Sequence, residues 1–350
     1  MTLPNVILSQ SKLRILYTFS SGLSSPEAST APLRPGYTAL IINVYNIFTM
    51  AGQTPSYRKL GLSELSDKVQ AAEEMLRSCR LCGHRCGVDR TAGEAGICDT
   101  ADVPVVASYG PHVGEEAPLV GTGGSGTIFL GNCNLKCIFC QNADISQEGG
   151  GSPMPTARLS GIMLGLQEMG CHNLNLVSPT HQMPMILMAL FEAASRGLGL
   201  PVVYNTGGYD SLEALKILDG VVDIYMPDMK FSSSTASGML CGAKDYWDVN
   251  RKAVKEMHRQ VGDLKLDRTG IALRGLLVRH LVLPGGMSGT DGVLRFISSE
   301  ISKDTYLNIM DQYRPCHKAE GRPPLNRAIT ADEYKQALDL AAKYGLRRLA

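Results

Sequence analysis

Three cysteines that lie close together carry the clearest chemical signal in this chain. Cys133, Cys137 and Cys140 form the run CNLKCIFC, with C-x3-C-x2-C spacing and no fourth cysteine directly behind them. Three thiolates on one loop can hold three irons of a cubic cluster, whereas a structural cluster usually takes four. The remaining iron is then open, as a catalytic metal site keeps a position open for substrate. The apolar run 127–131 precedes the motif and predicts a loop at the carboxyl end of a strand.

The residue types alone leave two other interpretations open. The cysteines could be reduced thiols that lie together by chance, or they could form a zinc knuckle. Zinc prefers a fourth ligand nearby, and the motif with Phe139 before its last cysteine is more selective than a single C-x2-C pair. The spacing therefore favours an iron–sulfur cluster.

The run CNLKCIFC resembles the C-x3-C-x-aromatic-C signature of radical S-adenosylmethionine enzymes. This resemblance implies a [4Fe-4S] cluster on Cys133, Cys137 and Cys140, with S-adenosylmethionine on the open iron. It also implies that an electron from the reduced cluster cleaves the sulfonium and releases a 5′-deoxyadenosyl radical. A flavodoxin- or ferredoxin-type electron donor is then an expected partner.

The composition of the chain excludes several classes of binding partner. The 350 residues carry a formal net charge of +1 and no long basic run, which argues against nucleic acid or an anionic membrane surface as the main partner. No apolar stretch reaches the roughly 18 residues that suggest a membrane span. Ten cysteines without an N-terminal secretory pattern predict a reducing, cytoplasmic location and metal ligands instead of disulfides.

The chain divides into three predicted parts. Residues 1–55 are rich in Ser, Thr and Pro and poor in acids, which is typical of an organellar transit peptide, a disordered extension or a start codon assigned too far upstream. Organellar import is expected only under the first interpretation. Residues 56–125 predict a helix over 62–76 and a Cys-rich segment, and residues 126–350 predict the main domain.

From residue 127 onward, short apolar runs alternate with amphipathic patterns, which predicts βα units around a parallel sheet. The expected strands are 127–131, 173–178, 201–204, 221–226, 276–283 and 305–310. The expected helices are 159–169, 185–196, 212–218, 249–261 and 332–344, and Asp210/Glu213 and Thr330/Glu333 have the spacing of capping boxes. Six strands predict a partial (β/α)6 TIM-like barrel, as the resemblance also implies, with reacting groups at the carboxyl ends.

The segments that follow these strands resemble glycyl-radical-enzyme activating enzymes, and more closely pyruvate formate-lyase activating enzyme-like proteins. The resembling segments include SGTIFLGNCNLKCIFCQN, LPVVYNTGGYDSLE, LDGVVDIYMPDMKF and LLVRHLVLPGG. The resemblance implies that Phe139 and Gln141 flank the adenine, that Asn205 contacts the ribose, and that Asp228 and Lys230 lie near the cofactor and a substrate peptide.

Of two further sequence elements of this family, one is matched in this chain and the other is replaced. Arg279 matches its R-x4-P-G element. The Gly-Gly-Glu element that meets the cofactor's amino group is replaced by Ser178-Pro179-Thr180-His181, which leaves Thr180 as a weak substitute.

The resemblance implies an oxidoreductase that abstracts hydrogen from a protein, at a glycine Cα. Two alternatives stay open. The radical could modify another peptide or a small metabolite, or the protein could be an iron–sulfur electron carrier without turnover. A nicotinamide-dependent dehydrogenase is disfavoured because no G-x-G-x-x-G opens a helix.

An N-terminal Cys group precedes the predicted barrel; it comprises Cys79, Cys82, Cys86 and Cys98. Four thiolates can close a zinc site or hold an auxiliary cluster, but four reduced thiols packed as small apolar side chains would give the same spacing. The cysteines at 171, 241 and 316 are isolated, which predicts simple buried or surface thiols. His112, Glu115 and Glu116 could line the mouth of the barrel or form a solvated turn.

Overall fold

The structure, a computed structural model, describes residues 54–350. The extension predicted over residues 1–55 lies outside the described residues as far as residue 53. The division between residues 56–125 and 126–350 stays a prediction. No helix in the described part of the chain is long and apolar enough to cross a membrane.

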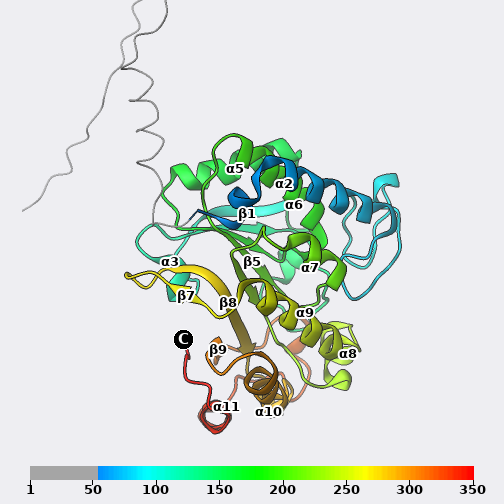
Figure 1. Cartoon of the computed structure of the whole chain (residues 1–350). Helices are drawn as coiled ribbons and strands as arrows, with labels where there is room; N and C mark the ends of the chain where they lie inside the picture. The colour runs from blue at the N-terminus through cyan, green and yellow to red at the C-terminus, as the bar shows by residue number, and fades with distance from the viewer. Residues whose placement is uncertain (1–53) are drawn as a thin grey trace, which may run out of the picture. The chain divides into compact units, whose positions relative to one another are not determined.

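The fold is mixed α/β with a central sheet (Figure 1). Neighbouring strands pair in parallel along one continuous path: β2 (Ser125–Leu130), β4 (Leu174–Val177), β5 (Val202–Thr206), β6 (Ile224–Pro227), β8 (Ala272–Leu281) and β9 (Tyr306–Met310). Each of the six predicted strands overlaps one of them, so the parallel sheet is confirmed. The carboxyl ends of all six strands therefore lie at one edge of this sheet.

Three antiparallel strands extend the sheet. β1 (Val105–His112) pairs with β2 and with the short β3 (Ser152–Pro153), and β7 (Lys265–Leu266) pairs with β8. Within residues 54–350 no backbone pairing joins β9 to β2. The sheet is therefore open in its hydrogen bonding, and its description as a partial barrel stays a prediction.

Helices connect the parallel strands, as parallel pairing requires. The predicted helices correspond to α5 (Thr156–Glu168), α6 (Met183–Ser195), α7 (Leu212–Leu218), α9 (Tyr246–Val261) and α11 (Ala331–Lys343). Four short helices were not predicted, namely α3 (Ala117–Val120), α4 (Ala143–Ser146), α8 (Ser234–Cys241) and α10 (Thr290–Phe296). Their few turns leave too little periodicity to detect in sequence.

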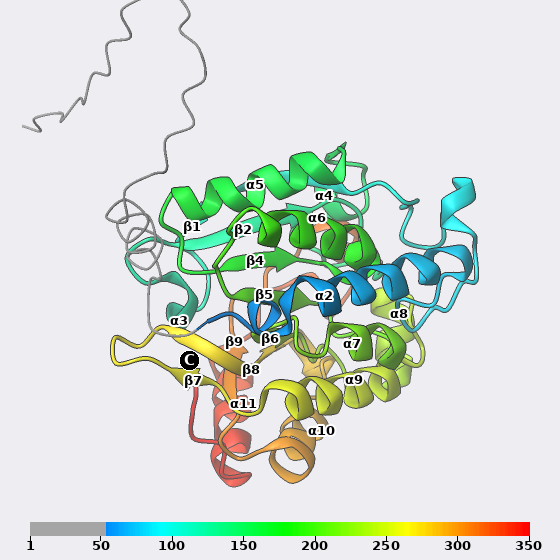
Figure 2. The ribbon, with the colours of Figure 1, turned by 45° about the horizontal axis from the view of Figure 1, so that its top comes forward.

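Helix α2 (Ser56–Glu74) lies across α6 and α7 (Figure 2). Its first turn is fastened to the sheet, because the Ser56 amide and hydroxyl donate to the Asp223 carboxylate at 2.8 and 2.7 Å. The Tyr57 hydroxyl also contacts the Leu198 and Leu200 carbonyls. Gly61 interrupts the helix with a φ of 77°, a conformation that glycine adopts without steric cost. The helix predicted from residue 62 is the part beyond this break.

The buried apolar side chains form three groups. The largest lies between the sheet and its helices, and it includes Leu174, Leu176 and Leu187. The third consists of residues such as Val203 and Leu277, which point to the other face of the sheet and pack against α3. Since both faces are covered, the strands read as continuous apolar runs in the sequence. The second group surrounds the loop after β2 and is described below.

The two predicted capping boxes have different outcomes. Thr330 and Glu333 form the box at the start of α11, as expected. The prediction for Asp210 and Glu213 is wrong, because Ser211 caps α7 by accepting a hydrogen bond from the Ala214 amide. The physical reason is that the Asp210 carboxylate is turned into the protein and accepts hydrogen bonds from side-chain hydroxyls.

Candidate functional site

The central Cys loop, residues 133–140, follows β2 at the carboxyl edge of the sheet. Its three cysteines belong to one group of packed side chains that also contains Phe139 and Leu135. The pKa of Cys133 is raised to about 12, chiefly by burial and also by the neighbouring Cys137 and Cys140. Metal ions bind thiolates and displace their protons, so a bound metal would offset this cost of ionisation.

A cavity of about 260 Å³ lies beside the central Cys loop. Several predicted site residues line it together: Cys137, Phe139, Cys140, Gln141, Asp228, Lys230 and Arg279. These residues come from the loop after β2, the loop after β6 and strand β8, far apart in sequence. Apart from Cys133, Asn205 and the weak candidate Thr180, the cavity brings together every residue that the sequence predicted for the cluster and cofactor site.

Charged side chains form the inner wall of this cavity. Asp228 lies between two cations: Arg279 Nε donates to its Oδ1 at 2.9 Å, and the Lys230 ammonium pairs with its Oδ2. Burial alone would raise the pKa of Asp228, but Arg279 and Lys230 outweigh it and lower the pKa. Burial opposes the charge of Lys230, yet Asp228 raises its pKa, so the ammonium stays charged. The cavity therefore presents a fixed set of charges.

Asn205 joins this network without lining the cavity. Its Oδ1 accepts a hydrogen bond of 2.7 Å from the Arg279 guanidinium, and the side chain is buried. Asn205 thus orients Arg279 toward Asp228. The predicted contact of Asn205 with a ribose stays a prediction.

Phe139 and Gln141 occupy different parts of the cavity wall. Phe139 is buried and packs edge-to-face against Phe231 and Tyr313, with ring centroids 6.0 and 6.2 Å apart. Gln141 is exposed at the mouth, where its Nε2 lies 3.5 Å from the Gln312 carbonyl oxygen. An aromatic wall and a polar mouth would suit a ligand that carries both a flat ring and polar groups.

Thr180 lies away from the cavity, so a role for its hydroxyl toward a cofactor is not supported. The side chain is buried, and its Oγ1 donates to Asp210 at 2.7 Å. Tyr204 and Thr206 also donate to this carboxylate. Burial raises the pKa of Asp210, while these hydroxyls lower it. Thr180, in the segment after β4, therefore supplies a hydrogen bond to the buried Asp210 in the segment after β5.

Comparison with known proteins places the chain in a family. It matches no protein-family model. It is 33% identical over 299 residues to the uncharacterized protein MJ0674 of Methanocaldococcus jannaschii, across 83% of this chain and 81% of MJ0674. The chain belongs to the MJ0674 family.

One solved structure has a partial likeness to this MJ0674-family protein. It is Streptococcus suis SuiB bound to the precursor peptide SuiA, with a TM-score of 0.42 and 13% identity. The match covers 61% of this chain and 44% of SuiB, so the chain spans less than half of SuiB's length. A likeness this distant carries no conclusion about function.

Two residues of α9 hold the cavity loops in place and were missed in the sequence. The Tyr246 hydroxyl lies 2.9 Å from the Asp228 carbonyl oxygen and accepts a hydrogen bond from the Lys230 amide at 3.0 Å. Asn250 Nδ2 donates to the Gly208 and Asp228 carbonyls at 2.9 and 3.0 Å. The i, i+4 spacing of Tyr246 and Asn250 was the available signal, since it puts both on one helix face.

The turn with Glu115 and Glu116 lies deeper than a solvated turn. Glu116 Oε1 is 3.8 Å from Arg279 and accepts a hydrogen bond from Asn308 at 3.2 Å. The pKa of Glu115 is raised to about 7. Burial is the main cause, Arg279 opposes it, and the neighbouring Glu116 adds to it. His112 packs against Phe129 instead, with ring centroids 5.8 Å apart. The two glutamates thus extend the network behind the cavity.

The four thiols of the N-terminal Cys group line one very small cavity of about 10 Å³. The buried Arg90 lies beside them, donates to the Ala101 and His181 carbonyls, and lowers the pKa of Cys98 against the raising effect of burial. Within residues 54–350, no three or more Cys, His, Asp or Glu side chains are arranged around a common metal position. The four thiols are neighbours, but neither they nor the three thiols of the central Cys loop are preformed around a metal position.

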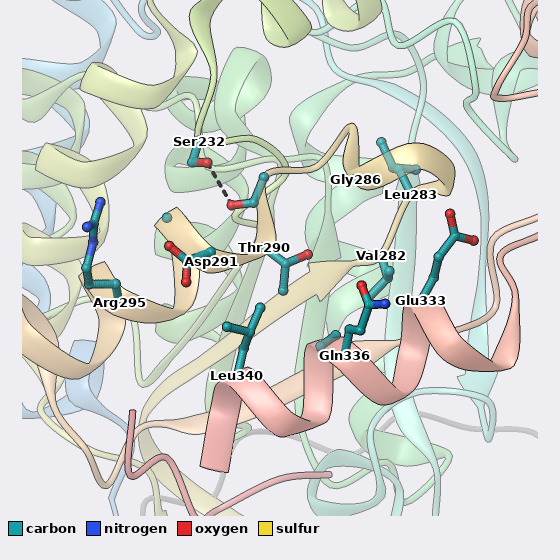
Figure 3. A pocket seen from close by; sticks show the side chains of 13 residues that line it. Ser232, Val282, Leu283, Gly286, Thr290, Asp291, Arg295, Glu333, Gln336 and Leu340 are labelled. Carbon is teal, nitrogen blue, oxygen red and sulfur yellow. Dashed lines mark hydrogen bonds between the residues drawn. The ribbon is translucent and has the colours of Figure 1, made fainter. Parts of the chain in front are cut away.

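A more spacious cavity, of about 490 Å³, lies elsewhere (Figure 3). It lies between the turn after β8 and helix α11. On its wall the Ser232 hydroxyl donates a hydrogen bond to the Gly289 carbonyl, which is the dashed line in Figure 3. Both of its acids already have partners: Glu333 pairs with Arg327 and the Gly285 amide, and Asp291 accepts a hydrogen bond from the Tyr344 hydroxyl. No cysteine lines this cavity, so the chemistry belongs to the smaller one at the central Cys loop.

Proposed function

We propose that this protein is a radical S-adenosylmethionine enzyme. The observation that supports the proposal most is the cavity where Cys137 and Cys140 meet the charged pair of Asp228 and Lys230. Asp228 and Lys230 lie far from the cysteines in the chain, so their position in this cavity is an observation separate from the cysteine motif.

The donor set of the central Cys loop fits a [4Fe-4S] cluster. Thiolates are the ligands that such clusters prefer, and Cys133, Cys137 and Cys140 are three sulfur donors within eight residues. The reduced cluster would supply the electron that splits S-adenosylmethionine into methionine and a 5′-deoxyadenosyl radical. Phe139 and Gln141 would contact the adenine from the cavity wall.

The chain's own residues would then hold the reactants and exclude water. Asp228 and Lys230 would bind the polar parts of the cofactor or steer the substrate, with Asn205 and Arg279 fixing their positions. The aromatic side chains around Phe139 would keep water from a reactive radical. None of these side chains needs to change its charge for this role.

We propose a protein or peptide as the substrate, with hydrogen taken from a glycine Cα, as in activating enzymes. A small metabolite or a different peptide modification is the second candidate. A non-enzymatic iron–sulfur carrier is the least favoured candidate, because an electron carrier does not need the charged side chains of Asp228 and Lys230 in a cavity beside the cluster. A flavodoxin- or ferredoxin-type protein would deliver the electron.

The N-terminal Cys group is proposed as a second metal site, for zinc or an auxiliary cluster. The shared cavity of its four thiols supports this, although the side chains would have to converge on binding. All ten cysteines are free thiols, which supports a reducing, cytoplasmic environment.

Anaerobic reconstitution with iron and sulfide, followed by dithionite and S-adenosylmethionine, tests the proposed function. We expect 5′-deoxyadenosine from the wild-type protein and none from Cys140→Ser. The variant Cys171→Ser is the matched control, since Cys171 is buried far from the loop in sequence and is absent from its packed group. Failure of the fully reconstituted protein to form 5′-deoxyadenosine would reject the proposal.

A further inference from the structure

Cys241, which the sequence suggests is an isolated thiol, lies against the central Cys loop. It is the last residue of α8 and packs in the same group of side chains as Cys137. Its thiol donates to the Ser237 carbonyl at 3.1 Å and lies near enough to Cys137 to raise the pKa of that thiol. Two cysteines more than a hundred residues apart in the chain are therefore direct neighbours.

The backbone holds this pair in place. The amide of Ile138 donates to the Leu240 carbonyl at 2.9 Å, and the amide of Lys136 donates to the Cys241 carbonyl at 3.2 Å. These bonds flank Cys137 on both sides. Gly242 ends α8 with a φ of 75°, which lets the chain turn away after Cys241.

This pairing suits a disulfide. Disulfides need a Cα separation of about 4.4–6.8 Å, and the backbone hydrogen bonds on both sides of Cys137 hold its segment directly against Leu240 and Cys241. The other two cysteines of the loop have different partners: Cys140 Sγ lies 3.3 Å from Ser146 Oγ, and Cys133 Sγ accepts from the Leu135 amide. Cys241 thus has one preferred partner among them.

We propose that Cys137 and Cys241 form a reversible disulfide whenever Cys137 carries no metal, and that this bond protects the loop from irreversible oxidation. The disulfide follows from the packing alone. Its protective value rests on the proposed cluster site, because Cys137 is one of the three proposed ligands.

A peroxide is the oxidant in this step. Cys137 borders the cavity and is 7% exposed, whereas Cys241 is 1% exposed, so peroxide reaches Cys137 first. The Cys137 sulfur takes one oxygen from hydrogen peroxide, and one water leaves. The Cys241 sulfur then attacks the sulfenic sulfur, the S–S bond forms, the S–O bond breaks, and a second water leaves. Two thiols lose two electrons and two hydrogens, and one peroxide is reduced to two waters.

The disulfide would block the deeper steps of oxidation. A sulfenic acid without a neighbouring thiol is oxidised onward to sulfinic acid, which thiol reductants do not reverse. A disulfide is reduced by such reagents. The loop would therefore recover its capacity to bind iron after oxygen exposure.

The test uses the full-length protein after its iron has been removed with a chelator. One equivalent of hydrogen peroxide is added, free thiols are alkylated, and disulfide-linked peptides are mapped by mass spectrometry. We expect the Cys137–Cys241 peptide to exceed any pair with Cys171 by at least about tenfold, since thiols held together react at high effective concentration. A reductant should remove it.

The variants Cys241→Ser and Cys171→Ser test whether the Cys137–Cys241 disulfide protects the loop from irreversible oxidation, separately from whether the disulfide forms. After peroxide and then reductant, Cys171→Ser should regain wild-type iron content on reconstitution, and Cys241→Ser should regain several-fold less. Cys137 found as sulfinic acid, or linked to Cys133 or Cys140, in the wild-type protein would overturn the proposal. The peptide map of the metal-free wild-type protein needs no cluster. It therefore tests the disulfide even when the proposed function is wrong or Cys241→Ser does not fold.

Discussion

The central Cys loop and the N-terminal Cys group both contain clustered cysteines, but they differ in the size of the adjacent cavity and in the charged residues around it. Cys137 and Cys140 border a cavity of about 260 Å³ with charged residues on its wall. The four thiols of the N-terminal group enclose about 10 Å³ and have Arg90 as their charged neighbour. Catalytic metal sites keep an open position, and structural ones are closed.

This difference shows that the space around cysteines decides their role as much as their spacing does. Both motifs are compatible with metal binding in the sequence. Only the central loop leaves room for a cofactor and substrate, with ionised groups to receive them. We therefore expect cysteine substitutions in the two regions to have different consequences, those in the central loop for turnover and those in the N-terminal group for stability.

The largest effect is expected for Cys137→Ser. Loss of residues that merely support metal ligands typically lowers activity by about 10–100-fold, so loss of a ligand should cost more than about 100-fold. S-adenosylmethionine cleavage by the reconstituted protein measures this. Iron content per chain should fall together with turnover, and an unchanged iron content would contradict the assignment.

Asp228→Asn should come next, because it leaves Lys230 and Arg279 without their shared carboxylate. Breaking a buried ion pair in this way typically costs about 3–5 kcal/mol of unfolding free energy, and the partly exposed Lys230, 21% accessible, favours the lower end. Denaturant unfolding of the two proteins measures the cost.

The pH dependence of that cost has a defined sign. The pKa of Asp228 is lowered in the folded protein, so its stabilising effect is present above the ordinary aspartate pKa of about 3.9 and is lost as the pH falls below it. The stability gap between wild type and Asp228→Asn should therefore close in acid. A gap that widens as the pH falls would contradict the ion-pair network.

Cys98→Ser tests the closed region. We expect a lower unfolding temperature, because a buried thiol next to Arg90 is replaced by a hydroxyl that has to be desolvated. S-adenosylmethionine cleavage per bound cluster at the central loop should stay near the wild-type value. A loss of turnover as large as that of Cys137→Ser would remove the distinction between the two regions.

The smallest effect is expected for Tyr246→Phe. It deletes a hydroxyl that contacts the backbone of Asp228 and Lys230, and the loss of one hydrogen bond costs about 1 kcal/mol. The KM for S-adenosylmethionine should rise by up to about tenfold while kcat changes less. Tyr209→Phe is the control, because the Tyr209 hydroxyl bonds Asp245 and not a cavity loop. Equal changes in KM for both variants would argue against a positioning role.

The sequence was informative where function and fold are local. The six parallel strands were visible because each is a short apolar run between helical patterns, and the central Cys loop because its three cysteines lie within eight residues. The family resemblance pointed to Asp228 and Lys230, which line the same cavity as Cys137 and Cys140. These features do not depend on which distant segments come together.

The partners supplied by distant segments could not be predicted. Cys241 looks isolated in the sequence and meets Cys137 only because α8 ends beside the loop. Tyr246 and Asn250 are ordinary helix residues until their contacts with the strand-end loops are known. Asp210 was misjudged as a cap because its carboxylate points into the protein, where the distant Thr180 and the nearby Tyr204 and Thr206 donate to it.

Electron paramagnetic resonance of the anaerobically reconstituted, dithionite-reduced protein tests the central claim most directly. The proposal predicts the signal of a reduced [4Fe-4S] cluster whose shape changes when S-adenosylmethionine is added, because the cofactor binds the open iron beside Cys137 and Cys140. The absence of such a signal in iron-loaded protein, or a signal that S-adenosylmethionine leaves unchanged, would contradict it.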